Sequence, residues 1–185
     1  ENCIVLDLGT TYFKATIFDG DGKLCALLRR PTPVESTQPG YSEIDAQTFR
    51  NTITAMIRDL YHEAPQRFPH IGAITFATQT NSFVLLDADG EALTPFVIWN
   101  DQRAKNHSPL LGELIALPGF YETTGVPGLS PEFMVAKLHW YQIQTPELWE
   151  RVARIALISD YLTLRFTGQF VTEAGAAGLT GLVDI

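Results

Sequence analysis

The N-terminal segment constrains the fold of this chain most, because two apolar runs of strand length are separated only by a short turn. The first run, Ile4-Val5-Leu6-Asp7-Leu8, is followed by Gly9, and the second run continues to Phe18. A glycine adopts backbone dihedrals that are closed to other residues, which allows a tight reversal. The sequence therefore predicts a pair of adjacent strands at the start of the chain.

The turn between these runs carries residues suited to a phosphate and its metal ion. Gly9 would let a ligand approach the main chain, and the amides and hydroxyls of Thr10 and Thr11 could then point at phosphate oxygens. Asp7 could hold Mg²⁺ through water, and Lys14 adds a positive charge. An ordinary hairpin turn, in which Asp7 bonds to the turn amides, explains the same residues.

The composition is that of an ordinary globular protein and argues against several functional classes. The 185 residues are 45% hydrophobic and 18% charged, which suits one domain or part of a larger one. No stretch of eighteen apolar residues and no signal-peptide pattern occurs, so we expect a soluble, cytoplasmic protein. The net charge of −8 disfavours nonspecific binding to nucleic acid or to an anionic membrane.

Residues 3–30 are expected to form a three-stranded meander. Its second turn is Asp19-Gly20-Asp21-Gly22, because Asp-Gly pairs are strong hairpin signals. Cys3 and Cys25 then lie on strands that a third strand separates, so we expect two buried thiols and no disulfide.

A helix is predicted from the N-cap Asp45 to about His62, followed by further strands. Its apolar face, which we expect to cover the sheet, consists of Phe49, Ile53, Ile57, Leu60 and Tyr61. Strands are predicted at residues 72–77, 83–87 and 96–99, the first of them buried.

The rest of the chain is predicted to be mainly helical. The expected elements are a helix over residues 102–117, one from Ser130-Pro131, one from Thr145-Pro146 to Arg154, one from Ser159-Asp160 to Gly168, a strand over 169–172 and a small-residue run over 174–178. This order of elements predicts a mixed α/β domain in which helices cover a sheet.

Several short motifs follow one another along nearly the whole chain. In order, they are Asp7-Leu8-Gly9-Thr10-Thr11 with Lys14, Tyr41-Ser42-Glu43-Ile44-Asp45, Gln79, Leu85-Leu86-Asp87 with Gly90, Ile98-Trp99-Asn100-Asp101-Gln102-Arg103, and Asp160-Tyr161-Leu162 through Thr167-Gly168. Together they resemble the FGGY family of carbohydrate kinases, especially its xylulokinase-like members. The resemblance implies an α/β, ribonuclease-H-like fold of the actin, Hsp70 and hexokinase type, with a mixed sheet flanked by helices.

This resemblance also implies a reaction and a phosphate site. In the family, ATP lies in the cleft between two domains and the sugar lies deep in the N-terminal domain. The γ-phosphoryl group passes to a sugar hydroxyl with help mainly from positioning and charge stabilisation. The family's first phosphate motif falls on Asp7, Gly9, Thr10, Thr11 and Lys14, with Asp7 near Mg²⁺.

The sugar site implied by the resemblance is formed by two segments. Gln79, Thr80 and Asn81 fall where xylulokinases have Gln-Met-His and glycerol kinases have Gln-Arg-Glu, so the sugar itself is not identified. Trp99 matches a tryptophan beside the substrate, with core packing as the alternative. The same wall continues through Asn100, Asp101 and Arg103.

The chain is expected to be most of the N-terminal, sugar-binding domain of a longer enzyme. The family's general base, an aspartate in a Gly-Gly-Asp-type motif, is expected beyond Ile185, and we do not assign that role to Asp184. We expect the C-terminal nucleotide-binding domain to lie outside residues 1–185, so these residues alone are expected to be inactive.

Two other functions share part of the pattern. An actin-like or Hsp70-like nucleotide-binding interaction protein would have the Asp7 turn but would lack the segment from Trp99 to Arg103. A ribonuclease-H-like nuclease would need further carboxylates beside Asp7. We therefore expect a small sugar or polyol as partner, with no nucleic acid and no membrane, and we leave a homodimer open.

Overall fold

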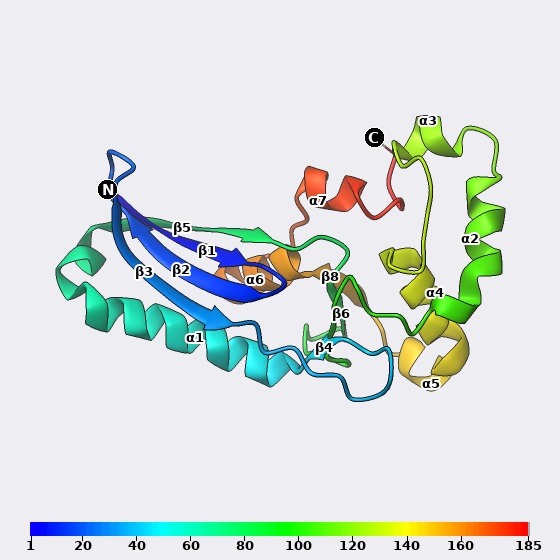
Figure 1. The fold of residues 1–185 in the computed structure, drawn as a ribbon, viewed down its shortest axis with the longest axis horizontal. Helices are drawn as coiled ribbons and strands as arrows, with labels where there is room; N and C mark the ends of the chain where they lie inside the picture. The colour runs from blue at the N-terminus through cyan, green and yellow to red at the C-terminus, as the bar shows by residue number, and fades with distance from the viewer. Residues whose placement is uncertain (185) are drawn as a thin grey trace. The chain divides into compact units, whose positions relative to one another are not determined.

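The computed structural model describes residues 1–184, with all of their side chains except those at positions 107, 108 and 110. The chain divides into two compact units (Figure 1). The first unit comprises Glu1–Pro33 and Gln47–Gln79, and the second comprises Val34–Ala46 and Thr80–Ile185.

The first unit is a four-stranded sheet with one long helix. Its elements are β1 (Asn2–Leu8), β2 (Tyr12–Phe18), β3 (Leu24–Pro31), α1 (Ala46–Glu63), the 3-10 helix η1 (Pro65–His70) and β5 (Ile71–Thr78). The strand order is β3-β2-β1-β5, and β5 runs parallel to β1 while β2 runs antiparallel to both neighbours. The predicted meander is confirmed, and α1 and η1 provide the crossover that a parallel pair requires.

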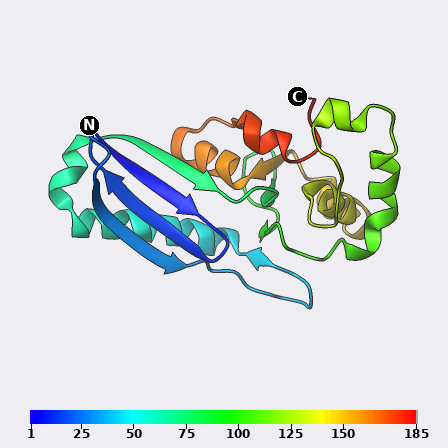
Figure 2. The same cartoon turned by 45° about the horizontal axis from the view of Figure 1, so that its top comes forward.

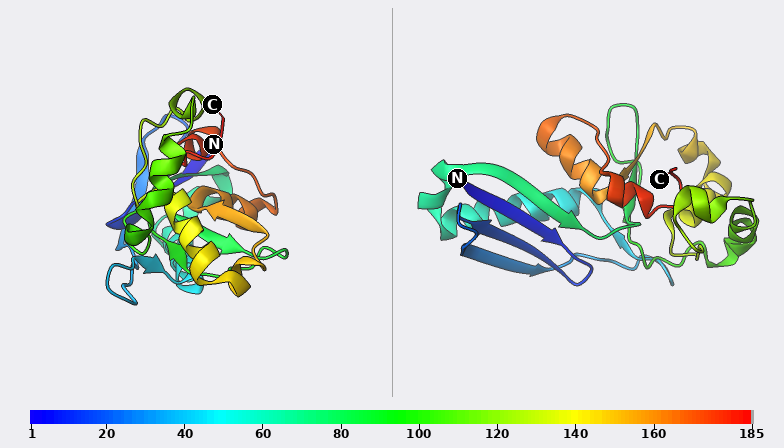
Figure 3. Two further views of the ribbon diagram at one scale, coloured as in Figure 1. Left: turned by 90° about the vertical axis from the view of Figure 1, so that its right-hand side faces the viewer. Right: turned by 90° about the horizontal axis from the view of Figure 1, so that it is seen from above.

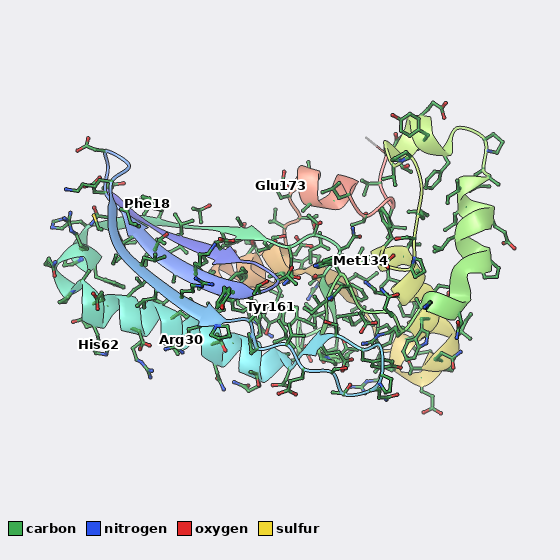
Figure 4. All side chains as sticks on the ribbon, in the orientation of Figure 1. Phe18, Arg30, His62, Met134, Tyr161 and Glu173 are labelled. Atoms are coloured by element: carbon green, nitrogen blue, oxygen red, sulfur yellow. The ribbon has the colours of Figure 1, made fainter. Side chains whose placement is uncertain are left out.

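Helix α1 lies along one face of this sheet (Figure 2). The ring of Phe49 meets Phe13 of β2 edge to face, with centroids 5.8 Å apart. Arg30 at the end of β3, labelled in Figure 4, forms an ion pair with Asp59 of α1. The predicted helix and its sheet-covering face are confirmed, but Met56 belongs to the buried stripe and Tyr61 is 48% exposed.

The predicted burial of β5 is wrong. Residues 72–75 are exposed, and Ile74 is 41% exposed. The apolar run resembles a strand that is covered on both faces, whereas β5 is an edge strand that pairs only with β1 among the described strands. The thiols of Cys3 and Cys25 are half-buried rather than buried, and β2 separates their strands.

The second unit contains a small antiparallel sheet and several helices. The strand order is β4-β7-β6-β8. Its elements are β4 (Glu43–Ile44), β6 (Phe83–Leu86), β7 (Phe96–Val97), η2 (Lys105–His107), α2 (Ser108–Ile115), α3 (Phe120–Thr124), α4 (Met134–Gln144), α5 (Pro146–Trp149), β8 (Arg154–Leu157), α6 (Ile158–Thr167) and α7 (Ala174–Gly178). Helices α2 and α4 lie side by side (Figure 3).

Several predicted boundaries in this unit are wrong. Residues 169–172 form no strand, α4 begins at Met134 rather than Ser130, and the helix after Thr145 ends at Trp149. Arg154, the predicted end of that helix, instead begins strand β8, whose residues 154–157 pair with β6, and such a tertiary partner overrides local propensity. Gly168 does end α6, in the left-handed conformation at φ 74°.

The core of the second unit fixes α4 against the sheet. Its members are Phe83, Leu85, Val97, Met134, Leu138, Tyr141 and Leu157. Tyr161 of α6 meets Phe96 of β7 edge to face at 5.0 Å; Met134 and Tyr161 are labelled in Figure 4. Helix α4 therefore has a defined position beside the segment that follows β7.

Candidate functional site

The turn between β1 and β2 brings the predicted phosphate residues together. Asp7 and Lys14 are register partners, and Lys14 Nζ donates to Asp7 Oδ2 at 2.7 Å. Both side chains remain almost half exposed, at 46% for Asp7 and 45% for Lys14. The charged pair is therefore accessible to a ligand from solvent.

The backbone of this turn is held by hydrogen bonds from Thr32, the residue that follows β3. The hydroxyl of Thr32 donates to Gly9 O at 2.8 Å, and the N–H of Thr32 donates to Thr11 O at 3.0 Å. A Cβ at Gly9 would lie 3.2 Å from Tyr12 O, so the close turn favours glycine. Thr10 and Thr11 are both exposed at the tip.

The same turn supplies one carboxylate for a metal ion. Within residues 1–184, no three His, Cys, Asp or Glu side chains gather as ligands for a metal. Mg²⁺ keeps several waters and often takes only one or two carboxylates beside substrate phosphates. Asp7 therefore suits an ion that arrives with a phosphorylated ligand, and does not suit an ion held in a cage of protein ligands.

Gln79, which follows β5, has an unusual side chain. Its backbone N–H donates to Leu8 O at 3.4 Å. Its Nε2 and Oε1 atoms are both buried, and neither has a hydrogen-bond partner among the described residues. A buried amide left in this state costs free energy, so such a group requires an explanation.

Asn81 occupies a structural position that the sequence did not indicate. Its backbone is left-handed, at φ 56°, which is uncommon for a residue other than glycine. Its Oδ1 accepts from Met134 N at 3.2 Å, and its Nδ2 donates to Leu179 O at 3.2 Å. The amide thus holds the first turn of α4, and the role of Asn81 as a sugar ligand stays a prediction. Thr80 beside it is exposed.

Trp99 follows β7 with a fixed backbone and an exposed ring. Its N–H donates to Ser82 Oγ at 2.9 Å, and its carbonyl accepts from Lys137 Nζ at 2.5 Å. The side chain is 40% exposed, which does not fit simple core packing. Asn100 is also exposed.

Asp101 and Arg103 form a buried ion pair. Arg103 Nε donates to Asp101 Oδ1 at 2.8 Å and Nη2 donates to Oδ2 at 2.9 Å, a bidentate geometry. The Arg103 and Asp101 side chains are 2% and 0% exposed. Their assignment as direct sugar ligands stays a prediction, because their charged atoms already bond within the protein.

Residues from distant segments complete this network. Arg103 also donates to Glu43 Oε1 at 2.6 Å and to Tyr141 Oη at 2.7 Å, and its guanidinium lies 4.2 Å from the centroid of Tyr41. Burial lowers the pKa of Arg103, but the hydrogen bonds to Asp101 and Glu43, together with the electrostatic contributions of Tyr141 and Asp101, outweigh burial and raise the guanidinium pKa. The motif at 41–45 therefore meets the motif at 98–103.

Sequence reasoning missed three residues around these motifs: Ser82, Lys137 and Tyr141. The available signal was a charged residue inside an apolar helical run, Val135-Ala136-Lys137-Leu138. Lysine is almost never fully buried without partners, so a lysine in that position points to a specific role.

The sequence pattern of one family covers almost the whole chain. The N-terminal domain of the FGGY family of carbohydrate kinases matches residues 2–185. This chain belongs to the FGGY family. The resemblance inferred from the motifs is confirmed.

Curated FGGY relatives are longer than this chain. The xylulose kinase of Lactococcus lactis subsp. lactis (strain IL1403) is 29% identical over 180 residues, covering 97% of this chain and 36% of the relative. That of Escherichia coli (strain K12) is 29% identical over 182 residues, covering 98% and 37%. The chain thus spans little more than a third of the length of these relatives.

Solved FGGY-type structures share the fold. A xyloylose kinase from Brucella ovis superposes with a TM-score of 0.90 at 29% identity, covering 100% of this chain and 37% of that one. A gluconate kinase from Lactobacillus acidophilus gives 0.87 at 28% identity, covering 99% and 36%. The predicted fold class, α/β of the actin and Hsp70 type, is confirmed.

Across residues 1–184, no helix has both the length and the apolar character needed to span a membrane.

Proposed function

We propose that the full-length protein is an ATP-dependent kinase that phosphorylates a hydroxyl of a sugar or polyol. The observation that carries the proposal is the amide of Gln79, whose two polar atoms are buried without a partner among the described residues. A sugar hydroxyl both donates and accepts hydrogen bonds, so a polyol could satisfy both ends of this amide. The family assignment supports the same class of substrate.

In this proposal the turn of Asp7, Gly9, Thr10, Thr11 and Lys14 receives the transferred phosphate. Lys14 offers positive charge, and the exposed tip at residues 10–11 offers main-chain and hydroxyl groups. Bound Mg²⁺ would neutralise phosphate charge during transfer, with Asp7 as its carboxylate. ATP and Mg²⁺ are the cofactors that the residues of this turn fit.

The proposed sugar ligands are Gln79, Thr80, Trp99 and Asn100, which stand at the positions of the family's sugar-binding motifs. An exposed indole gives an apolar face for the C–H side of a sugar, and amides and hydroxyls give polar partners for its O–H groups. Asn81, Asp101 and Arg103 would belong to the same wall, with Asn81 held by a partly buried hydrogen bond and the Asp101–Arg103 pair by buried ones.

The general base and the adenosine-binding residues would come from the rest of the full-length protein. We therefore expect residues 1–185 alone to bind a sugar weakly and to show no sugar-dependent ATP consumption. Relatives are named xylulose kinases and one solved neighbour is named a gluconate kinase, so a pentulose is the first acceptor to test and an aldonate the second.

The test is an ATP-consumption assay of the full-length protein with xylulose, ribulose, gluconate and glycerol as acceptors. The proposal expects ATP consumption with at least one of these and little without acceptor. If ATP binds but no acceptor increases its consumption, a nucleotide-binding interaction protein of the actin or Hsp70 kind becomes the better interpretation.

A further inference from the structure

We propose that Lys137 is a positioning residue that holds the main chain of Trp99 in the orientation needed for sugar binding. This inference rests on the kinase function proposed above. Lys137 lies in α4, outside the sequence motifs, and its side chain is fully buried.

The ammonium group of Lys137 is saturated by main-chain carbonyls. Its Nζ donates to Trp99 O at 2.5 Å, to Glu132 O at 2.8 Å and to Ile98 O at 3.2 Å. The residue is 0% exposed. A lysine ammonium has three N–H donors, so all three are used, and two of the three acceptors are the consecutive carbonyls of Ile98 and Trp99.

Trp99 is held from its other side as well. Its own N–H donates to the hydroxyl of Ser82, a fully buried side chain. Both main-chain polar groups of Trp99 are thus fixed, while its indole stays 40% exposed. This is the arrangement that presents an aromatic ring to a ligand with little backbone ordering left to occur on binding.

The first turn of α4 links Lys137 to the other sugar-site segment. Asn81 accepts from the N–H of Met134, one helical turn before Lys137. The segment after β5 and the segment after β7 are therefore both attached to the start of the same helix. A displacement of Lys137 would change the backbone position of Trp99 first, because Lys137 Nζ donates directly to the Trp99 carbonyl.

The charge of Lys137 makes its hydrogen bonds to the Ile98 and Trp99 carbonyls sensitive to pH. Burial lowers the pKa of Lys137 to about 8, the carboxylates of Asp101 and Glu132 oppose this change, and Arg103 adds to it. Above that pH the neutral amine keeps two N–H groups for three carbonyls. The hold on the Ile98 and Trp99 carbonyls is then expected to weaken.

The first test is steady-state kinetics of the full-length protein with xylulose as acceptor, or gluconate where xylulose is not phosphorylated. Lys137→Met removes the donors at similar volume, and Lys105→Met removes an exposed lysine of η2 as control. We expect the sugar KM of Lys137→Met to rise about tenfold, because the substitution removes the hydrogen bonds to the Ile98, Trp99 and Glu132 carbonyls. The ATP KM and the kinetics of Lys105→Met should stay within about twofold of wild type.

The second test uses the pH profile, so it does not depend on whether Lys137→Met folds. In the wild type, the sugar KM should rise severalfold between pH 7 and pH 9 while the ATP KM stays level. Ser82→Ala, which releases the other side of Trp99, should raise the sugar KM at every pH and keep this profile. In Lys137→Met the sugar KM should not follow pH.

Different outcomes separate this inference from the function it rests on. No sugar-dependent turnover in the wild type overturns the kinase proposal and this inference with it. Normal turnover with a level sugar KM across pH, or equal rises of sugar and ATP KM in Lys137→Met, overturns the inference alone.

Discussion

The two turns that carry the proposed chemistry are held by the protein in different ways. After β1, Asp7 makes one ion pair with Lys14, and both side chains stay almost half exposed. After β7, Arg103 and Asp101 are 2% and 0% exposed and bond to residues from other segments. The first turn leaves its charges open to solvent, and the second uses its charges in bonds within the protein.

Under the proposed function, the charged residues Asp101 and Arg103 of the family motif support the sugar site without facing the sugar. A buried charge that loses its partner is strongly destabilising, so Arg103 cannot easily turn toward a sugar. The neighbouring Trp99, with a fixed backbone and an exposed ring, is the residue of that segment best placed to touch one.

The largest expected effect is on stability. Arg103→Met leaves the carboxylates of Asp101 and Glu43 buried without their partner, and should lower the free energy of unfolding by about 3–5 kcal/mol. Lys14→Met breaks an exposed pair and should change it by less than about 1 kcal/mol. Urea denaturation of the full-length protein, followed by circular dichroism, measures both, and similar losses in the two variants would contradict the comparison.

Asp7→Asn tests the exposed turn through catalysis. Its carboxylate charge is proposed to act on the metal and phosphate, so kcat should fall by about 100-fold or more. Because Asp7 is half exposed, sugar affinity measured by calorimetry should stay close to wild type. Equal loss of kcat and of sugar affinity would instead indicate a structural role for Asp7.

Trp99→Ala tests the presented ring. Removing an indole that covers a sugar should reduce the binding free energy by about 2 kcal/mol, because of the apolar area involved. This corresponds to a sugar KM about 30-fold higher. The ATP KM should not change. A larger effect on ATP than on sugar would show that the assignment of Trp99 is wrong.

The parts predicted from sequence are those whose signals are local. Asp7 and Lys14 are seven residues apart on one hairpin, so the strand pattern alone brings them together. Gly168 ends α6 as expected, because its left-handed conformation is a property of one residue. The overall fold followed from such elements and from the joint order of the motifs.

The parts that were missed depend on contacts between distant residues. The bond from Arg103 to Glu43 spans 60 positions and that from Lys137 to Trp99 spans 38. Strand β8 exists because β6 lies beside it, and residues 169–172 lack such a partner among the described strands. No local pattern encodes these partners, so the contacts of Ser82 and Lys137 with Trp99 could not be predicted from the sequence.

The central claim, that this chain forms the sugar wall of a kinase, is tested most directly at Gln79. In the full-length protein, Gln79→Met replaces an unpartnered buried amide by an apolar group of similar size, with the exposed Gln66→Met as control. Isothermal calorimetry with the best acceptor of the ATP-consumption assay measures the sugar affinity, and thermal unfolding without sugar measures the melting temperature. The account predicts sugar binding weakened about tenfold with a melting temperature equal to or above wild type. Unchanged sugar affinity, or a melting temperature that falls together with affinity, would contradict it.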